Sequence, residues 1–409
     1  MHSLFISPLG PLMPDDAWHG IHHRMRTLVR AVSQVSERVT MLHLAAPEDG
    51  ALHVVPSALA AQQSALWGVE VDVQLIRTEP VMRGFRAHYV DGLLRPLHQP
   101  DFRRFTGPAQ VQAVASVLAT KPDLVVVQRL PAMAALLAGS LRPPRLAFDV
   151  DDLEHKARWR AALVPPFRPS SLLYAAHALR LIPAVAAAVH RAAATFVCSE
   201  TDRKHLHRLG LGRRVHVVPN AVPFPPVAAL PTGTPPESLL FLGNLSHAPN
   251  RQAASRLVTR IWPVVRARRP AATLAVAGQG AEGVEGFAAP PPGVSFPGFV
   301  PSLDALYAGC RVVVCPITTG GGTRLKLIEA AAYAKPIVST RLGAEGLDFR
   351  DGQEALLRDD DASLAIACAD LLADPVRCAQ MGAAARARAV TMYDAAKIEQ
   401  QVARLLQSL

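Results

Sequence analysis

The chain has 409 residues, half of them hydrophobic and few of them aromatic, and its formal net charge is +10. One hydrophobic core does not normally support that length, so we expect two domains of roughly 200 residues each. The basic residues are scattered, without a long Lys/Arg block or a zinc-finger or RNA-binding signature. We therefore expect no nucleic-acid partner, and the charge suits an anionic small molecule, with or without a membrane surface.

The cysteines and the apolar segments indicate a cytoplasmic protein. Five cysteines at wide spacings, without a CxxC pair, are typical of reduced, buried thiols. The N-terminus lacks the regions of a signal peptide. The longest apolar stretch, Leu172 to Val197, is interrupted by Arg, His and Pro, which disfavours a transmembrane helix. A packed helix is the main interpretation there, and a helix lying peripherally on the inner face of the membrane is the alternative.

In the first half, short apolar runs alternate with segments of helical spacing. Such alternation indicates βαβ units and a parallel sheet. Helices are predicted at Ile21–Val35 and Val111–Leu118. The predicted strands are Leu4–Ser7, Val39–Leu44, Val69–Ile76, Leu124–Val127, Arg145–Val150, Ala194–Cys198 and Val215–Val218.

A Pro-rich stretch, residues 223–236, predicts a linker, and the same alternation restarts after it. The predicted strands of the second half are Leu239–Leu242, Ala272–Ala277, Val294–Phe296, Val312–Cys315 and Pro336–Ser339. Its predicted helices are Gln252–Arg268, Leu303–Ala308, Thr323–Ala334 and a long pattern over Ala383–Leu409.

These elements predict an α/β protein with two Rossmann-like, doubly wound parallel-sheet domains. We expect the first domain at residues 1–222, the second at 237–385, and a C-terminal helix at 386–409 that packs back on the first domain. Ligands of such sheets lie at the carboxyl ends of the strands, so a ligand is expected in a cleft that both sheets face.

The segment from Cys315 to Ala330, CPITTGGGTRLKLIEA, carries the most chemical information. A buried strand leads into Gly320, Gly321 and Gly322, which with Thr323 open a helix whose unpaired N–H groups can bind an anion. Lys326 and Glu329 are three residues apart and therefore share one helix face. Lys326 can place a positive charge beside a diphosphate, and Glu329 can accept two hydrogen bonds from ribose hydroxyls. The string is neither a P-loop nor a GxGxxG fingerprint. The alternative is a Gly-rich turn beside an ordinary surface Lys–Glu pair.

With its surroundings, this segment resembles the GT-B-fold glycosyltransferases of family 4, the glycosyl transferases group 1 type. The resemblance covers nearly the whole second half and touches the first. It is carried by Phe241-Leu242-Gly243-Asn244, Pro249-Asn250, Ala277-Gly278, Val294–Val300, Pro316–Glu329, Ala330–Ala332, Pro336–Val338, Gly343–Gly346, Ser199, Asp202 and Val218–Ala221.

The resemblance implies a retaining transfer from a nucleotide-diphosphate sugar to a glycan or lipid-linked acceptor, with no metal and no other cofactor. It places Gly243, Gly278, Phe299 and Val300 beside the donor and assigns the ribose to Glu329. The family has a second glutamate eight positions earlier, where this chain has Gly321. Arg324 and Lys326 are then the candidates to stabilise the departing diphosphate.

In the first half, the segment Trp18 to Arg24 follows the first strand and loop, where the family has a glycine facing donor and acceptor. Gly20 permits close approach there, and we expect Arg24 to reach a phosphate. The histidines of this segment suggest a metal site as an alternative, although no carboxylate accompanies His19 and His23.

The other catalytic candidates follow the strand that ends near Val150. Asp151, Asp152 and His155 are expected to orient the acceptor hydroxyl or take its proton. The alternative is that Asp151 or Asp152 caps a helix. Ser199 and Asp202 form a predicted capping box with a structural role.

Two other activities stay open. The loss of the first glutamate motivates a protein that binds a nucleotide sugar without turning it over, and the same fold supports nucleotide-sugar epimerases.

Overall fold

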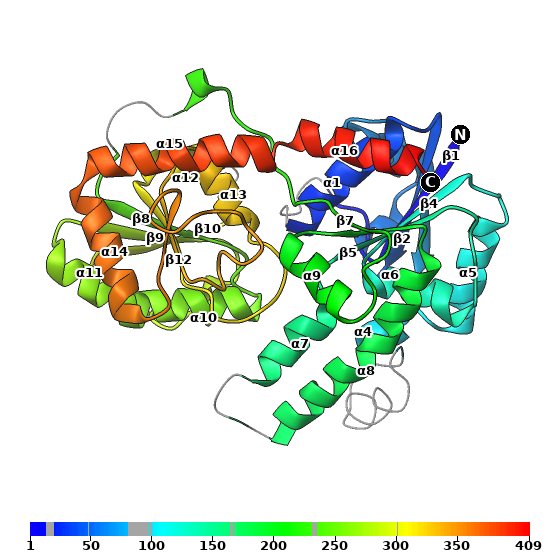
Figure 1. Ribbon diagram of the computed structural model, residues 1–409, viewed down its shortest axis with the longest axis horizontal. Coiled ribbons are helices and arrows are strands. Elements are labelled where there is room, and N and C mark those ends of the chain that lie inside the picture. The colour runs from blue at the N-terminus through cyan, green and yellow to red at the C-terminus, as the bar shows by residue number, and fades with distance from the viewer. Residues whose placement is uncertain are drawn as a thin grey trace. The chain divides into compact units, whose positions relative to one another are not determined.

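The structure is a computed structural model that describes residues 1–13, 20–47, 49–80, 97, 100–163, 167, 169–230, 235–300 and 302–409. It divides into two compact units that are not consecutive segments of the sequence (Figure 1). Unit 1 contains Met1–Pro219, Gly320–Gly322 and Lys397–Leu409. Unit 2 contains Asn220–Thr319 and Thr323–Ala396.

The described part of unit 1 is built on a seven-stranded sheet in the order β3-β2-β1-β4-β5-β6-β7. All its pairings are parallel, and the winding direction changes between β1 and β4. The strands are β1 (His2–Ser7), β2 (Arg38–Ala45), β3 (Asp72–Arg77), β4 (Leu124–Gln128), β5 (Leu146–Asp151), β6 (Ala194–Val197) and β7 (Val215–Val217).

Strand β4 shows why the sheet forms. Its sequence is Leu-Val-Val-Val-Gln and every residue in it is buried, as expected for a parallel strand covered on both faces. The helices of unit 1 are α1 (Gly20–Ser33), α2 (Pro56–Trp67), α4 (Pro100–Arg103), α5 (Pro108–Leu118), α6 (Arg129–Ala138), α7 (Glu154–Ala162), α8 (Pro169–Arg191), α9 (Glu200–Arg208) and α16 (Ala395–Gln407).

Helix α16 completes unit 1 from the far end of the chain. Ile398, Val402 and Leu406 recur at helical spacing and are buried. Arg30 of α1 lies 3.2 Å from the carboxylate of Glu399. The side chain of Gln401 donates to the carbonyl of Val217, the last residue of β7, at 2.9 Å.

The second half of α8 packs into the core of unit 1. Within the described residues, one helical stretch, Ser171–Arg191, is long and apolar enough to cross a membrane, by length and composition alone. Leu181, Val185 and Val189 of this stretch belong to the buried core, together with residues of β4 and β5.

Unit 2 repeats the same topology in a six-stranded parallel sheet, in the order β10-β9-β8-β11-β12-β13, among its described residues. The winding direction changes between β8 and β11. The strands are β8 (Ser238–Leu242), β9 (Thr273–Ala277), β10 (Val294–Gly298), β11 (Val312–Cys315), β12 (Ile337–Ser339) and β13 (Ala355–Leu357). The expected pair of doubly wound parallel sheets is thus confirmed.

Two predicted helices are interrupted. The one predicted at Gln252–Arg268 contains a π-helical turn, Leu257–Ile261. The one predicted over Ala383–Leu409 breaks at Tyr393, because Val222 donates to the carbonyl of Tyr393 and pairs with Asp394 in an isolated bridge. The helices of unit 2 are α10 (Ala248–Arg256), α11 (Trp262–Arg268), α12 (Leu303–Gly309), α13 (Leu325–Ala332), α14 (Asp361–Ala373) and α15 (Pro375–Met392).

Candidate functional site

The change of winding in unit 2 places a candidate site at the carboxyl ends of β8 and β11. These neighbouring strands end at Leu242 and Cys315. Gly243 follows the first, and the glycine-rich loop that leads into α13 follows the second. In open doubly wound sheets, ligands bind in the crevice outside such strand ends.

Backbone hydrogen bonds connect the ends of β8, β9 and β10. The N–H of Gly243 donates to the carbonyl of Ala277 at 3.0 Å, and the N–H of Gly278 donates to that of Gly298 at 2.8 Å. Gly278 has a φ of 137°, and a Cβ there would overlap the carbonyl oxygen of Gly243. This position therefore requires glycine, and the strand ends present bare backbone.

Lys326, in the first turn of α13, lies beside Gly243. Its Nζ donates to Oδ1 of Asn250 at 2.9 Å and lies 4.4 Å from the centroid of the Phe241 ring. A Cβ on Gly243 would lie 2.6 Å from this nitrogen, so the glycine provides the space that the ammonium occupies. Burial, with a further contribution from Arg324, lowers the pKa of Lys326 to about 8.

Glu329 shares the helix face of Lys326. Burial raises the pKa of its carboxyl to about 7, and the nearby Lys326 charge opposes this. The hydroxyl of Tyr307 donates to Oε2 of Glu329 at 3.5 Å. Tyr307 is itself fixed, because its ring is buried and stacks on that of Tyr333 with the centroids 4.5 Å apart.

The surroundings of Lys326 are electropositive. His247 lies at the N-cap position of α10, and its pKa is lowered first by burial and then by the charges of Arg324, Lys326 and Arg251. Arg324 is 9% exposed and donates to the carbonyl of Thr319 at 3.4 Å. The sequence analysis did not identify His247 as a site residue. Its position in the loop after β8 could have indicated it, because ligands bind at the carboxyl ends of such strands.

The glycine-rich loop adopts backbone conformations that need glycine. Gly320 and Gly322 have φ values of 98° and 68°, whereas Gly321 has no positive φ. Thr323 Oγ1 accepts a hydrogen bond from Asn220 at 2.8 Å. The helix begins at Leu325 rather than at Thr323 as predicted. Its first N–H groups therefore follow directly on the loop.

The other predicted donor residues of unit 2 follow β10. Phe299 is 51% exposed and Val300 is half-buried, next to Gly298 at the strand end. They neighbour Gly278 through the hydrogen bond between Gly278 and Gly298. An exposed aromatic ring at this edge of the sheet is available to a planar ligand.

In unit 1, Arg24 is an internal ion-pair partner. Its Nε donates to both carboxylate oxygens of Asp149 at 2.9 Å, and Nη1 donates to the carbonyl of Val218 at 2.9 Å. Both side chains are buried, and a buried carboxylate needs such a partner. The prediction that Arg24 reaches a phosphate is therefore wrong. Gly20, at the start of α1, is exposed, and His19 and Trp18 lie outside the described residues.

Asp151 lies between two arginines at the end of β5. Its oxygens are 3.8 Å from Nε of Arg24 and 3.8 Å from Nε of Arg129, and Arg129 also lies 3.6 Å from Glu154. Arg129 and Asp151 both have positive φ, 65° and 55°. Backbone strain of this kind clusters at functional sites. The sequence carried no signal for Arg129, because the left-handed conformation is not a preference of arginine.

His155 is more enclosed than expected. It is 4% exposed, its Nε2 lies 2.8 Å from Nε2 of His205, and its Nδ1 is buried without a partner. Burial first, then the positive surroundings from His205 and Lys156, lower its pKa to about 4. The imidazole is therefore neutral near pH 7.

Asp152 is half-buried, and its N–H donates to the carbonyl of Val150 at 2.7 Å. The N-cap residue of α7 is Leu153, which makes no side-chain cap, so the helix-capping alternative for Asp151 and Asp152 is wrong. The cap predicted for α9 is confirmed, since the hydroxyl of Ser199 accepts from the N–H of Asp202 at 3.1 Å.

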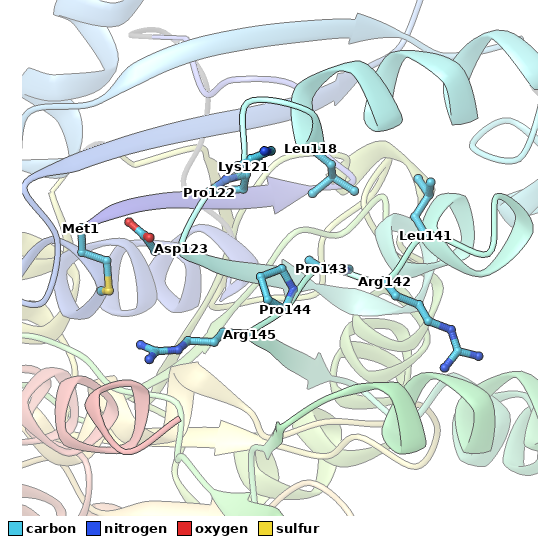
Figure 2. A pocket seen from close by; sticks show the side chains of 10 residues that line it. All are labelled: Met1, Leu118, Lys121, Pro122, Asp123, Leu141, Arg142, Pro143, Pro144 and Arg145. Carbon is cyan, nitrogen blue, oxygen red and sulfur yellow. The ribbon is translucent and has the colours of Figure 1, made fainter.

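No group of three or more His, Cys, Asp or Glu side chains suited to a metal ion occurs among the described residues. An open depression of about 770 Å³ lies at the amino ends of β1, β4 and β5. Figure 2 shows its basic side chains, Lys121, Arg142 and Arg145, extending from the loops before β4 and β5. It is thus at the opposite end of the sheet from Asp151.

Two units with this topology define a class of protein, the GT-B fold. Sucrose-phosphate synthase from Thermosynechococcus elongatus is similar with a TM-score of 0.70 and 20% identity, over 100% of this chain and 98% of that one. Anabaena HepE in complex with UDP-glucose is similar with a TM-score of 0.67 and 17% identity, over 100% of both chains. A putative UDP-N-acetylglucosamine 2-epimerase from Listeria monocytogenes is similar with a TM-score of 0.58 and 13% identity, over 100% of this chain and 96% of that one.

Residues 236–374 match the family described as Glycosyl transferases group 1, and all of them except Gly320–Gly322 belong to unit 2. The expected resemblance to this family is thus confirmed for this part of the chain. An uncharacterized 44.6 kDa protein in the cps region of Klebsiella pneumoniae is 26% identical over 136 residues. That match spans 31% of this chain and 35% of the relative.

Proposed function

We propose that this chain is a glycosyltransferase that transfers a sugar from a uridine diphosphate sugar to a hydroxyl of a glycan or a lipid-linked acceptor. The observation that carries the proposal is the pair formed by Lys326 and Glu329 at the carboxyl ends of β8 and β11. The pair supplies one cation and one carboxylate on one helix face, which suits a diphosphate and a ribose. Anabaena HepE, with the same fold, binds UDP-glucose, which supports uridine as the base.

The donor-site residues of unit 2 bind the two ends of the nucleotide, the diphosphate and the ribose. Arg324, Lys326 and the N–H groups that begin α13 stabilise the charge that grows on the diphosphate as the glycosidic bond breaks. Because these groups provide the positive charge, the transfer is expected to need no metal. Glu329 holds the ribose, and the strand ends at Gly243 and Gly278 contact the nucleotide through their backbone.

On the acceptor side, we assign the proton to Asp152. Asp151 lies between two arginines and His155 is buried against His205, so both are positioning residues in this proposal. As the family resemblance implies, the acceptor attacks from the face that the leaving group vacates, and the anomeric configuration is retained.

The test has two stages. Thermal unfolding is measured with UDP, GDP and ADP over a range of concentrations, and a nucleotide at about a hundred times its dissociation constant stabilises the folded state by about 2.7 kcal/mol. A shift with one nucleotide that is lost in Glu329→Ala supports the donor site. No shift with any of them, in a folded sample, would refute it.

The second stage separates the activities. A glycosyltransferase releases UDP only when an acceptor is present, and the rate falls in Lys326→Ala. Interconversion of UDP-sugars without an acceptor would instead show an epimerase. Tight binding without either reaction would show a protein that binds the nucleotide sugar only.

A further inference from the structure

Exposed apolar side chains gather on the helical hairpin of α7 and α8. Among the described residues, thirteen large hydrophobic side chains are exposed. Five of these belong to the hairpin and the residues between its helices, within twenty-one positions of the chain; the others are distributed over both units. The five are Trp159 (42% exposed), Leu163 (54%), Phe167 (70%), Leu172 (78%) and Leu179 (54%).

The spacing of these residues gives each helix an apolar stripe. Trp159 and Leu163 are four apart, and Leu172 and Leu179 are seven apart, so each pair lies on one helix face. The two helices pack on each other and extend away from the sheet of unit 1 (Figure 1). The hairpin therefore presents its apolar stripes outside the core.

Apart from Glu154 at the start of α7, the charged side chains of the hairpin are all basic. From His155 to Ser199 the sequence has six Lys or Arg residues and no Asp or Glu. Arg180 of α8 is exposed, and Arg160 of α7 is half-buried. A cationic segment that also exposes Trp, Phe and Leu matches an anionic lipid surface, where the rings and aliphatic chains enter the interface and the guanidinium groups meet the phosphates. A protein partner with a mixed-charge surface would not select for the absence of acids.

We propose that the α7–α8 hairpin is a membrane-docking element that inserts Trp159, Leu163, Phe167 and Leu172 into the interface of an anionic bilayer. It lies on the bilayer and does not span it, because the second half of α8 is part of the core of unit 1. The proposal is independent of the donor site.

Docking by this hairpin has a consequence for the acceptor. Helix α7 begins at Glu154, two residues after Asp152. With nine residues it is about 13 Å long. Asp152 and His155 would therefore lie within a short distance of the lipid surface, where a lipid-linked acceptor has its head group.

The test is sedimentation of the full chain with vesicles of phosphatidylcholine containing 30% phosphatidylglycerol, compared with pure phosphatidylcholine. Binding is expected to the anionic vesicles, and it should weaken steeply as the salt concentration rises. Phe167→Ser/Leu172→Ser is expected to weaken binding at least tenfold. Arg160→Gln/Arg180→Gln should weaken it about 25-fold, since each basic residue near an anionic surface contributes about fivefold.

The matched control is Val55→Ser/Val376→Ser, which removes two side chains of similar exposure (64% and 66%) outside the hairpin. It should bind as the unmodified protein does. Quenching of Trp fluorescence by brominated lipid should be lost in Trp159→Phe. Glu329→Ala should bind vesicles normally, which separates this proposal from the donor site.

The proposal is overturned if neither vesicle binds the protein, or if the control and hairpin variants bind equally. A concentration-dependent dimer that Phe167→Ser/Leu172→Ser abolishes, without vesicle binding, would assign the apolar stripes to a second copy of the chain instead.

Discussion

The raised pKa of Glu329 predicts that nucleotide binding weakens below neutral pH. If only the carboxylate accepts hydrogen bonds from both ribose hydroxyls, the affinity follows its ionised fraction. With a pKa of about 7, that fraction falls from about three-quarters at pH 7.5 to about one-tenth at pH 6, a factor of about eight. Lys326, with a pKa of about 8, gains charge over the same range, which reduces the expected net loss to about sixfold.

The measurement is a titration of the protein with UDP by calorimetry at both pH values, using the unmodified chain and Glu329→Gln. The amide does not titrate, so the sixfold loss should disappear in the variant. At pH 7.5 the variant should bind UDP at least tenfold more weakly, because hydrogen bonds to a charged group contribute about 1.5–3 kcal/mol. The phosphate of UDP titrates near pH 6, and comparing the two proteins removes that contribution.

A modified nucleotide tests the ribose assignment itself. The nucleotide 2′-deoxyuridine diphosphate lacks one of the two ribose hydroxyls. It should therefore bind the unmodified protein more weakly than UDP does, by about 1 kcal/mol or more. In Glu329→Gln the two nucleotides should differ much less. The same pH dependence in both proteins, or the same penalty for the missing hydroxyl, would refute the reasoning.

Further predictions concern the backbone positions and the buried ion pair. Gly243→Ala should fold normally and bind UDP at least several-fold more weakly, because its Cβ meets only side-chain atoms, the end of Lys326 and the amide of Asn250; a calorimetric affinity equal to that of the unmodified chain would contradict this. Gly278→Ala should unfold several degrees lower, since its Cβ meets backbone and its φ is positive; scanning calorimetry checks it. Arg24→Leu should destabilise the fold by about 3–5 kcal/mol, because it leaves Asp149 buried and unpaired, and Arg24→Leu/Asp149→Leu should recover part of that loss in denaturant unfolding.

The sequence was sufficient for the fold, and it placed Lys326 and Glu329 on one face of one helix. The continuous apolar run Val312–Cys315 is a strand with the predicted bounds. A strand that is buried on both faces is apolar at every position, so its first and last residues can be recognised in the sequence. The placement of Lys326 and Glu329 was possible because the two residues are only three positions apart, so the helical repeat alone predicts that they share a face. The proposed roles of these two residues stay predictions.

What the sequence did not show are the contacts between distant segments. Arg24 and Asp149 are 125 positions apart, and no local sequence pattern predicts that they form an ion pair. The left-handed backbone of Arg129 and Asp151 is imposed by the surrounding unit against their own preference. The break at Tyr393 is likewise set by pairing with Val222, which lies far away in the chain.

The membership of α16 in unit 1 determines the order in which a ribosome can complete the two units. Among the described residues, unit 2 contains none beyond Ala396, whereas unit 1 lacks a helix until residues 397–409 have been made. At a synthesis rate of about 5–20 residues per second, the nascent first unit waits roughly 10–40 s after Pro219 for α16. During that wait, the unit 1 surface that Ile398, Val402 and Leu406 will cover stays open to solvent. A nascent chain stalled before Lys397 should therefore be the form of this protein that chaperones and proteases recognise.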